Sequence, residues 1–222
     1  EIKRLLMVHS LFNEHRIVSN FSNMALGFLH KEVPKGDGPV SHMPHGTPMT
    51  MPVSYAPWTD EHTVTSMLVL KNGQIVHEAY YHGTSADDLR ISWSIAKSYL
   101  SALFGILVHE GAIHSLKEPV TKYVPSLAGG AYDTATILDV LQKSSGITFD
   151  EDYLAYHSDI NKMGRILALG GTMDGFAEGL RDTFAAPGET WQYTSIDTHV
   201  LGMVLRSATG RSIVDLMSEK VI

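Results

Sequence analysis

The hydrophobic pattern of the chain changes from strand-like to helix-like after residue 81. Residues 63–70 (Thr-Val-Thr-Ser-Met-Leu-Val-Leu) and 75–81 (Ile-Val-His-Glu-Ala-Tyr-Tyr) are rich in β-branched and aromatic residues. Asn72 and Gly73 stand between the two runs, and this pair readily adopts the two positive φ angles of a tight hairpin turn. We therefore expect an antiparallel hairpin over residues 63–81.

Helical patterns dominate from residue 93 onward. The longest expected helix covers residues 93–110 and is followed by Gly111 as a stop signal; its apolar positions surround most of the helix, which predicts a central, buried location. Further helices are expected at 135–142, 160–169 and 196–208, and a last one from about residue 212. A hairpin followed by helices predicts an α+β fold with helices packed on an antiparallel sheet. Since an isolated hairpin is only marginally stable, the sheet should contain further strands.

The first 62 residues have a different character. Residues 1–30 mix apolar and polar positions in a way that fits a loosely packed helical arm. Residues 31–62 contain six of the nine prolines, too many for a helix or an inner strand. We therefore expect an extended N-terminal arm over residues 1–62, followed by one domain over residues 63–222.

Composition excludes several classes of protein. The 222 residues are 44% hydrophobic and 18% charged, as in an ordinary globular protein, and the net charge of −7 gives no basic footprint for nucleic acid. The absence of cysteine excludes disulfides, zinc-thiolate sites and cysteine nucleophiles. No apolar run is long enough to span a membrane. Because the chain starts at Glu1, a removed leader stays conceivable, and a bacterial cytoplasmic or periplasmic location is equally open.

Histidines are numerous but do not form a recognisable metal motif. His42 and His45 lie close together in a segment rich in proline and methionine, and no third ligand follows at a useful spacing. We expect surface histidines there, and neither a metal nor any other cofactor.

The strongest chemical motif is Ser94-Ile-Ala-Lys97 at the start of the longest expected helix. A serine hydroxyl needs a base to become a nucleophile, and a lysine can serve if its amine is neutral near neutral pH, which burial favours. The i,i+3 spacing places both side chains on one helical face. Ser-x-x-Lys occurs by chance about once in a chain of this length. The location favours a catalytic role, because a lysine at the start of a buried helix costs free energy unless its amine has a partner or a function.

Tyr193 is a second candidate, since it lies between a Pro-Gly turn and the helix expected from residue 196. A tyrosine hydroxyl beside a Ser/Lys pair can carry the proton from the nucleophile to the leaving group, although most of the nine tyrosines should be packing or surface residues. The acidic residues 150–152 are adjacent in the chain and do not face one another, so a solvated loop is expected. Tyr153, which follows them, is a candidate substrate contact.

In combination these segments resemble the superfamily of serine β-lactamases, penicillin-binding proteins and family VIII esterases, and within it the aminohexanoate-oligomer (nylon-oligomer) hydrolases. The resemblance rests on three segments in the family's order: residues 91–98 (Ile-Ser-Trp-Ser-Ile-Ala-Lys-Ser), 137–147 (Ile-Leu-Asp-Val-Leu-Gln-Lys-Ser-Ser-Gly-Ile) and 187–195 (Pro-Gly-Glu-Thr-Trp-Gln-Tyr-Thr-Ser). It covers roughly residues 60–222 and is specific only as a combination.

The resemblance implies a β-lactamase/transpeptidase-like fold in which Ser94 is acylated, Lys97 is the general base and Tyr193 relays the proton. Ser195 stands where many relatives carry an asparagine that binds a substrate amide. The family's third motif, Lys-Thr-Gly or His-x-Gly on a strand that donates the second oxyanion-hole N–H, is absent from the 29 residues after Tyr193. We therefore expect the last strands to come from a C-terminal continuation or from a second polypeptide.

The implied reaction is acyl transfer to Ser94 followed by hydrolysis of an ester or small amide, as in a carboxylesterase or an aminohexanoate-oligomer hydrolase. The sequence leaves open a β-lactamase or a D-alanyl-D-alanine peptidase. From another class, it leaves open a catalytically silent sensor domain or a truncated fragment. A small-molecule substrate is the expected partner, and assembly into a homo-oligomer stays open.

Overall fold

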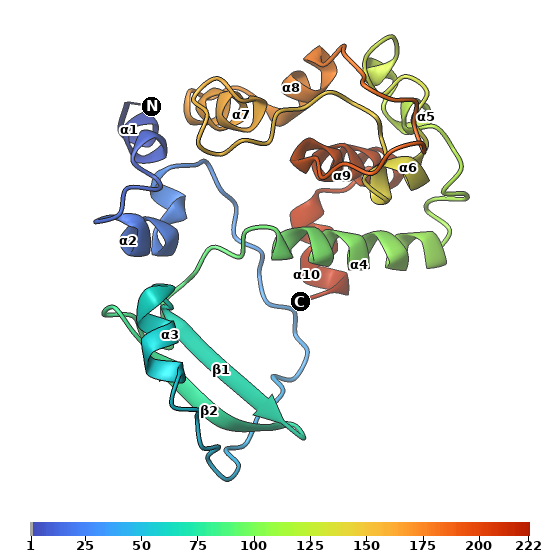
Figure 1. The fold of residues 1–222 in the computed structure, drawn as a ribbon. Coiled ribbons are helices and arrows are strands. Elements are labelled where there is room, and N and C mark those ends of the chain that lie inside the picture. The colour runs from blue at the N-terminus through green and yellow to red at the C-terminus, as the bar shows by residue number, and fades with distance from the viewer. Residues whose placement is uncertain (1) are drawn as a thin grey trace. The chain divides into compact units, whose positions relative to one another are not determined.

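The computed structural model describes residues 2–222, which form two compact units. Residues 10–24 and 37–91 make up the first, here called the hairpin unit, and residues 2–9, 25–36 and 92–222 make up the second, the helical unit. The elements in Figure 1 are, in chain order, α1 (Ile2–His9), α2 (Ile17–Ser22), the 3-10 turn η1 (Met24–Leu26), α3 (Tyr55–Glu61), β1 (Ser66–Lys71), β2 (Gln74–Tyr80), α4 (Ile95–His109), α5 (Val120–Tyr123), the 3-10 turn η2 (Pro125–Leu127), α6 (Ile137–Leu141), α7 (Asp159–Ala168), α8 (Met173–Gly179), α9 (Ser195–Thr209) and α10 (Ile213–Lys220). The predicted domain boundary at residue 62 does not coincide with the boundary of either unit. It stays a prediction.

The expected hairpin is confirmed. Strands β1 and β2 pair antiparallel in a two-stranded sheet, with a register irregularity between Val69 and Leu70. Asn72 has φ +52° and Gly73 has φ +76°, so the turn uses the left-handed conformations that this pair tolerates. No other strand pairs with β1 among residues 2–222. Residues 44–49 lie along the other edge of β2 and hydrogen-bond the backbone of Ile75 and Val76.

The expectation of an extended segment over residues 31–62 is wrong at its end, because α3 forms there. Pro57 is the third residue of this helix, where a missing N–H costs nothing since the first-turn N–H groups have no intrahelical acceptor. The Tyr55 hydroxyl, at the start of α3, lies 2.8 Å from His77 Nε2 and 2.8 Å from the Tyr81 hydroxyl. Tertiary contacts with the hairpin therefore override the proline count.

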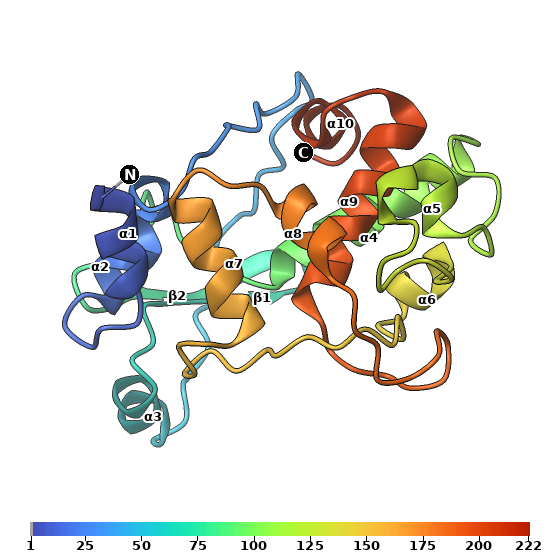
Figure 2. The same ribbon diagram turned by 90° about the horizontal axis from the view of Figure 1, so that it is seen from above.

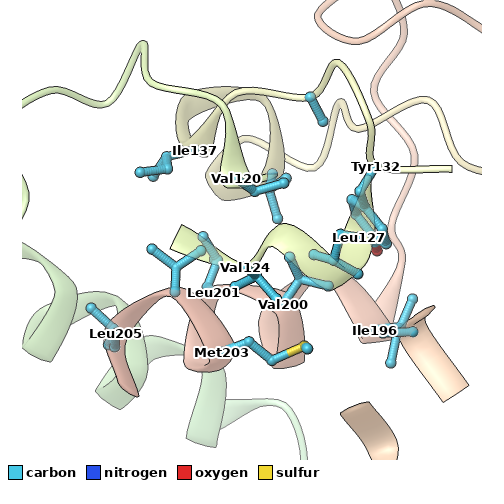
Figure 3. Close-up of a cluster of buried hydrophobic side chains, with 14 of the residues drawn as sticks. Val120, Val124, Leu127, Tyr132, Ile137, Ile196, Val200, Leu201, Met203 and Leu205 are labelled. Atoms are coloured by element: carbon cyan, nitrogen blue, oxygen red, sulfur yellow. The ribbon is translucent and has the colours of Figure 1, made fainter. Parts of the chain in front are cut away.

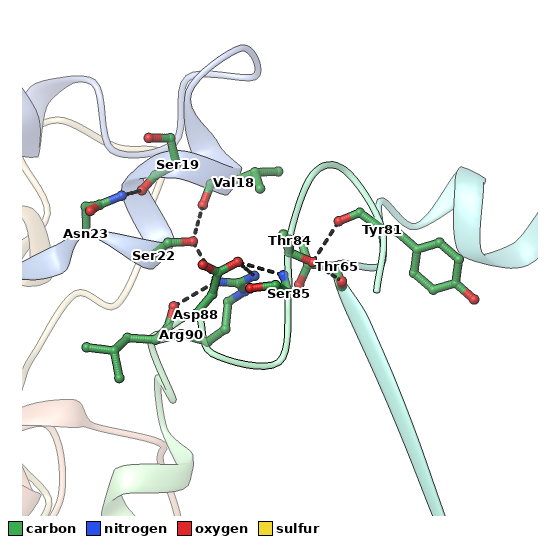
Figure 4. Close-up of polar contacts among 11 residues, drawn as sticks. Val18, Ser19, Ser22, Asn23, Thr65, Tyr81, Thr84, Ser85, Asp88 and Arg90 are labelled. Atoms are coloured by element: carbon green, nitrogen blue, oxygen red, sulfur yellow. Dashed lines mark hydrogen bonds and ion pairs between the residues drawn. The ribbon is translucent and has the colours of Figure 1, made fainter. Parts of the chain in front are cut away.

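The segment after β2 is fixed by polar contacts within the hairpin unit (Figure 4). The Thr84 hydroxyl donates to the Thr65 carbonyl at 2.6 Å. Arg90 pairs with Asp88 at 3.0 Å and donates to the Ser22 hydroxyl on α2 at 2.9 Å. These bonds hold residues 84–91 against the hairpin and α2.

The helical unit is built around α9. Figures 1 and 2 show this helix among α4, α5, α6, α8 and α10, and it contacts all five. Its buried side chains meet those of α5, α6 and the intervening loops in one apolar core (Figure 3). The labelled members of that core are Val120, Val124, Leu127, Tyr132, Ile137, Ile196, Val200, Leu201, Met203 and Leu205.

The central helix is thus α9, and the prediction that the helix over 93–110 is central and buried is wrong for the described residues. Only Leu103, Phe104 and Leu107 of α4 are fully buried, on the side that contacts α9 and α10. Nearer its start, Ile95 is 63% and Tyr99 50% exposed. Composition alone could not distinguish a helix that is enclosed from one with an apolar face that no described residue covers.

The other expected helices are confirmed within a few residues as α6, α7, α9 and α10. Helices α5 and α8 were outside the prediction because they contain only four and seven residues, too few to show a period. None of the helices in residues 2–222 has the length and apolarity to cross a membrane.

Candidate functional site

The site is placed by a sharp turn into α4. Trp93 has φ +44°, a left-handed conformation that costs a bulky residue about 1–3 kcal/mol and is found where geometry must be fixed. Ser94 follows as the N-cap of α4 with an exposed side chain, and that side chain makes no capping bond. Its hydroxyl is therefore available for other contacts.

Three of the predicted residues meet at this hydroxyl. The Ser94 Oγ lies 2.6 Å from the Tyr193 hydroxyl, across 99 residues of sequence, and Lys97 Nζ donates to Ser94 Oγ at 3.0 Å. Lys97 Nζ also lies 5.5 Å from the centre of the Tyr193 ring, within the range of a cation–π contact. Ser94 is thus within hydrogen-bond reach of an amine and of a phenol at once.

The first turn of α4 offers fewer free N–H groups than a regular helix. The N–H groups of Ile95, Ala96 and Lys97 donate to the carbonyls three residues earlier, at 3.0–3.1 Å. The Ser94 N–H makes no hydrogen bond with the residues described. It is therefore a backbone donor at this turn that can bind an anionic group beside the Ser94 hydroxyl.

Tyr193 is held by the loop that follows α6. The Gln192 N–H donates to the Lys143 carbonyl at 2.8 Å, and Lys143 Nζ donates to the Thr194 carbonyl at 3.0 Å. The Gly188 N–H donates to the Ser144 carbonyl at 2.8 Å. Ser144 and the following Ser145-Gly146 turn belong to this loop, so the resemblance segments 137–147 and 187–195 are in direct contact.

Ser195 and Tyr153, the two predicted substrate contacts, both bind Glu151. The Ser195 N–H donates to Glu151 Oε2 at 3.0 Å, its hydroxyl donates to Oε1, and the Tyr153 hydroxyl donates to Oε1 at 2.9 Å. Burial and the neighbouring Glu151 carboxylate raise the pKa of Tyr153. The interpretation of residues 150–152 as a purely solvated loop is thus wrong for Glu151, which caps the start of α9.

A second carboxylate, Asp197, is fully buried in α9. Its Oδ1 accepts hydrogen bonds from the Tyr132 hydroxyl at 2.8 Å and from the Ser145 hydroxyl at 2.9 Å, whereas Oδ2 has no hydrogen-bond partner among the described residues. Burial raises its pKa to about 6, and Lys143 opposes that effect. Asp197 ties the Ser145-Gly146 turn to α9, the helix that follows Tyr193.

This carboxyl predicts a specific dependence of stability on pH. Because the folded pKa lies above the ordinary 3.8, folding is favoured by protonation of Asp197, and this contribution is lost as the pH rises through about 6. Between about pH 4.5 and pH 7 the native chain should lose about 2 kcal/mol more free energy of unfolding than Asp197→Asn. Urea unfolding of both proteins across that range measures the difference.

The asparagine retains a side-chain oxygen that can accept hydrogen bonds from Tyr132 and Ser145. The comparison therefore measures the effect of the negative charge alone. A matched variant, Asp182→Asn, changes an exposed carboxylate and should follow the native pH dependence. Parallel curves for the native chain and Asp197→Asn would contradict the raised pKa.

Residues 2–222 contain no cluster of three histidine, cysteine, aspartate or glutamate side chains that could hold a metal ion. His45 instead lies in the segment bonded to β2, where it forms a bridge with Ile75.

Sequence reasoning did not identify Lys143, Glu151 or Asp197 as members of the site. Lys143 and Asp197 lie within or next to segments that carry the resemblance, but they match no motif residue. Glu151 lies between two other acids, and the sequence does not distinguish it from these neighbours, whose side chains face elsewhere.

Comparison with known proteins extends the likeness beyond the three motifs. The family model described as Beta-lactamase matches residues 60–222. The 6-aminohexanoate-dimer hydrolase of Paenarthrobacter ureafaciens is 32% identical over 164 residues, which are 72% of this chain and 42% of that protein.

Solved structures share the fold. A Bacillus anthracis protein named after the 6-aminohexanoate-dimer hydrolases superposes with a TM-score of 0.81 at 18% identity, over 95% of this chain and 60% of that one. A class C β-lactamase from Rhodobacter sphaeroides gives a TM-score of 0.51 at 22% identity, over 76% of this chain and 46% of that one. Both show the fold alone.

The chain therefore spans less than half of its curated relative and three fifths of the first of these structures. The predicted β-lactamase/transpeptidase-like fold is confirmed for the part present, as helices with a two-stranded antiparallel sheet. With the family model matching most of its length and a curated relative above 30% identity, this chain belongs to the Beta-lactamase family.

Proposed function

We propose that the chain carries the acyl-transfer site of a serine hydrolase, with Ser94 as nucleophile, Lys97 as general base and Tyr193 as proton relay. The observation that carries the proposal is the meeting of these three side chains, with 2.6 Å and 3.0 Å separating Ser94 Oγ from the phenol and the amine. A base within hydrogen-bond reach of a serine hydroxyl is the arrangement that nucleophilic catalysis requires.

The proposed reaction has two halves. Lys97 takes the Ser94 proton as Oγ attacks the substrate carbonyl, and the Ser94 N–H donates to the resulting oxyanion. Tyr193 passes the proton to the leaving oxygen or nitrogen, and an alcohol or amine departs. Water then attacks the acyl-serine, gives up its proton through the same groups, and releases the acid.

The proposed substrate is an ester or a small linear amide. Support comes from a curated relative, whose name describes hydrolysis of an aminohexanoate dimer, and from the family match over residues 60–222, which include Ser94 and Tyr193. The exposed position of Ser94 supports access by a small substrate. A β-lactam is the rival substrate, and a chromogenic cephalosporin turned over faster than p-nitrophenyl esters would favour it.

A fluorophosphonate probe tests the proposal directly, because it labels a serine only when that serine is activated. We expect mass spectrometry to find the label on Ser94, and we expect Lys97→Met to remove it. Ser101, exposed two turns later on α4, serves as an internal control and should stay unlabelled. An unlabelled Ser94 in the folded protein would favour the catalytically silent alternative.

Tyr193→Phe is expected to slow ester turnover about a hundredfold, the usual scale for losing one proton-transfer partner, with the fold unchanged. The kinetic constant kcat, measured with p-nitrophenyl acetate, tests this. Tyr156→Phe is the matched control, because this tyrosine is exposed and its ring stacks on Arg165 without needing the hydroxyl. A kcat within about twofold of the native value would make Tyr193 a packing residue.

We also propose that the active molecule contains further strands, from a continuation of this chain or a second polypeptide, beside β1. Support comes from β1 itself: no strand pairs with its outer edge among residues 2–222, and Leu68 and Leu70 are about half exposed. An unpaired strand edge presents N–H and C=O groups that can pair with another segment. In the active species, β1 amides should be protected from hydrogen exchange relative to the 222-residue chain. A soluble 24.4 kDa monomer with full activity would contradict this proposal.

A further inference from the structure

We propose that Lys143 is a positioning residue of the Ser94 site, and that it fixes the Tyr193 hydroxyl against Ser94 by bonding both chain neighbours of Tyr193. The inference rests on the proposed function of Ser94 and Tyr193 and adds a residue outside the Ser-x-x-Lys and tyrosine motifs.

The hydrogen bonds place Lys143 on both sides of the tyrosine. Its carbonyl accepts from the N–H of Gln192, the residue before Tyr193, at 2.8 Å. Its Nζ donates to the carbonyl of Thr194, the residue after Tyr193, at 3.0 Å, and to the Thr198 hydroxyl one turn further along α9 at 2.9 Å. One residue thus joins the segment before Tyr193 to the helix after it.

The conformation of Lys143 also points to a constrained role. Its φ is +60°, in the left-handed region that the clash of Cβ with the backbone disfavours, yet the residue is lysine rather than glycine or asparagine. Glycine would relieve the backbone but would remove the amine. The chain therefore keeps a strained lysine where the amine reaches Thr194 and Thr198.

The ammonium of Lys143 also acts on the site through its charge. Lys143 Nζ lies 5.9 Å from the centre of the Tyr193 ring, and Lys97 Nζ lies 5.5 Å from the centre of the same ring. Asp197 and Glu151 attract the charge and Lys97 repels it, while burial is the main cause of a lowered Lys143 pKa. Lys143 therefore belongs to a cluster of two cations and two carboxylates around Tyr193.

Two variants separate this role from simple packing. Lys143→Met keeps the length of the side chain but removes the amine, so kcat for ester hydrolysis should fall about 10- to 100-fold with KM within about twofold. Loss of a cation from the cluster should also move the acidic limb of the kcat–pH profile to higher pH, because the variant lacks the repulsion between Lys143 and Lys97. Asp197→Asn, which removes an anion, should move the same limb to lower pH.

Chemical rescue gives the sharpest test, since the chain has no native cysteine. In Lys143→Cys, alkylation with 2-bromoethylamine rebuilds a primary amine at this single position. We expect kcat to be low before alkylation and to recover at least tenfold after it. Lys162→Cys, at an exposed lysine paired with Asp159 on α7, receives the same treatment and should show no change.

The outcomes decide between the two proposals. If Ser94→Ala is inactive while Lys143→Met turns over like the native protein, the positioning role is wrong and the proposed function stands. If Ser94→Ala keeps full activity, the proposed function is wrong. Loss of activity in Lys143→Met without recovery on alkylation of Lys143→Cys, or without a shift of the acidic limb, would assign Lys143 a structural role only. If Lys143→Met does not fold, Lys143→Cys before and after alkylation decides in the same way.

Discussion

Ser94→Ala is expected to abolish hydrolysis of p-nitrophenyl esters, with a fall in kcat/KM of at least about 10⁴-fold. Among the described residues, the hydroxyl to which Lys97 Nζ donates is that of Ser94, so the residual rate should come from binding and the oxyanion-hole donor alone. The free energy of unfolding should change by less than about 0.5 kcal/mol, because the side chain is exposed and makes no capping bond. Ester kinetics and urea unfolding of the same preparation test both parts.

The matched control for this prediction is Ser101→Ala, which removes an exposed hydroxyl from the same helix and should keep native kinetics. An equal fall in both variants would indicate that α4, rather than one hydroxyl, was disturbed. Native-like turnover in Ser94→Ala would refute the assignment of the nucleophile.

The sequence pattern correctly predicted those elements in which local conformational preferences and tertiary contacts favour the same structure. The hairpin follows from Asn72-Gly73, which supplies both positive φ angles, and α9 ends at Gly210, which has φ +65° as a helix C-cap requires. The sequence pattern did not predict α3, because the contact of Tyr55 with β2 outweighs the effect of the prolines around it. It also failed for the burial of α4, because periodicity records which positions are apolar and not what covers them.

The same distinction applies to the candidate site. Ser94 and Lys97 could be paired from sequence because they are three residues apart in one helix. Tyr193 lies 99 residues away, and only the order of family motifs connected it with Ser94. Lys143 could not be inferred, because its role depends on a left-handed backbone and on an amine that reaches Thr194 across 51 residues.

Glu151 and Asp197 show why a charge pattern is a weak guide to a site. Asp150, Glu151 and Asp152 look equivalent in sequence, but only the middle side chain turns to Ser195, while Asp152 bonds the nearby Leu154 N–H. Asp197 is an isolated acid in an apolar helix. Its burial becomes understandable only once Tyr132 and Ser145, far away in sequence, are seen to donate to it.

Lys97→Met is expected to lower kcat for ester hydrolysis by about 10²- to 10⁴-fold, because it removes the amine that lies 3.0 Å from Ser94 Oγ and is proposed to take its proton. Stability should change little, since Lys97 is only half-buried, in contrast to the full burial that the apolar pattern of α4 suggested. The same assay on Lys162→Met, which removes an exposed lysine from α7, should give native rates. Survival of activity with an unchanged pH profile would exclude Lys97 as the base.

Lys97→Arg separates proton transfer from simple attraction of charge. The guanidinium keeps the positive charge beside Ser94 and Tyr193 but stays protonated at any pH at which the protein is folded, so it cannot accept the serine proton. We therefore expect Lys97→Arg to be as inactive as Lys97→Met and to resist fluorophosphonate labelling at Ser94. Recovery of turnover in the arginine variant to within about tenfold of the native rate would mean that Lys97 acts as a fixed cation, and that the Ser94 proton leaves through Tyr193 instead.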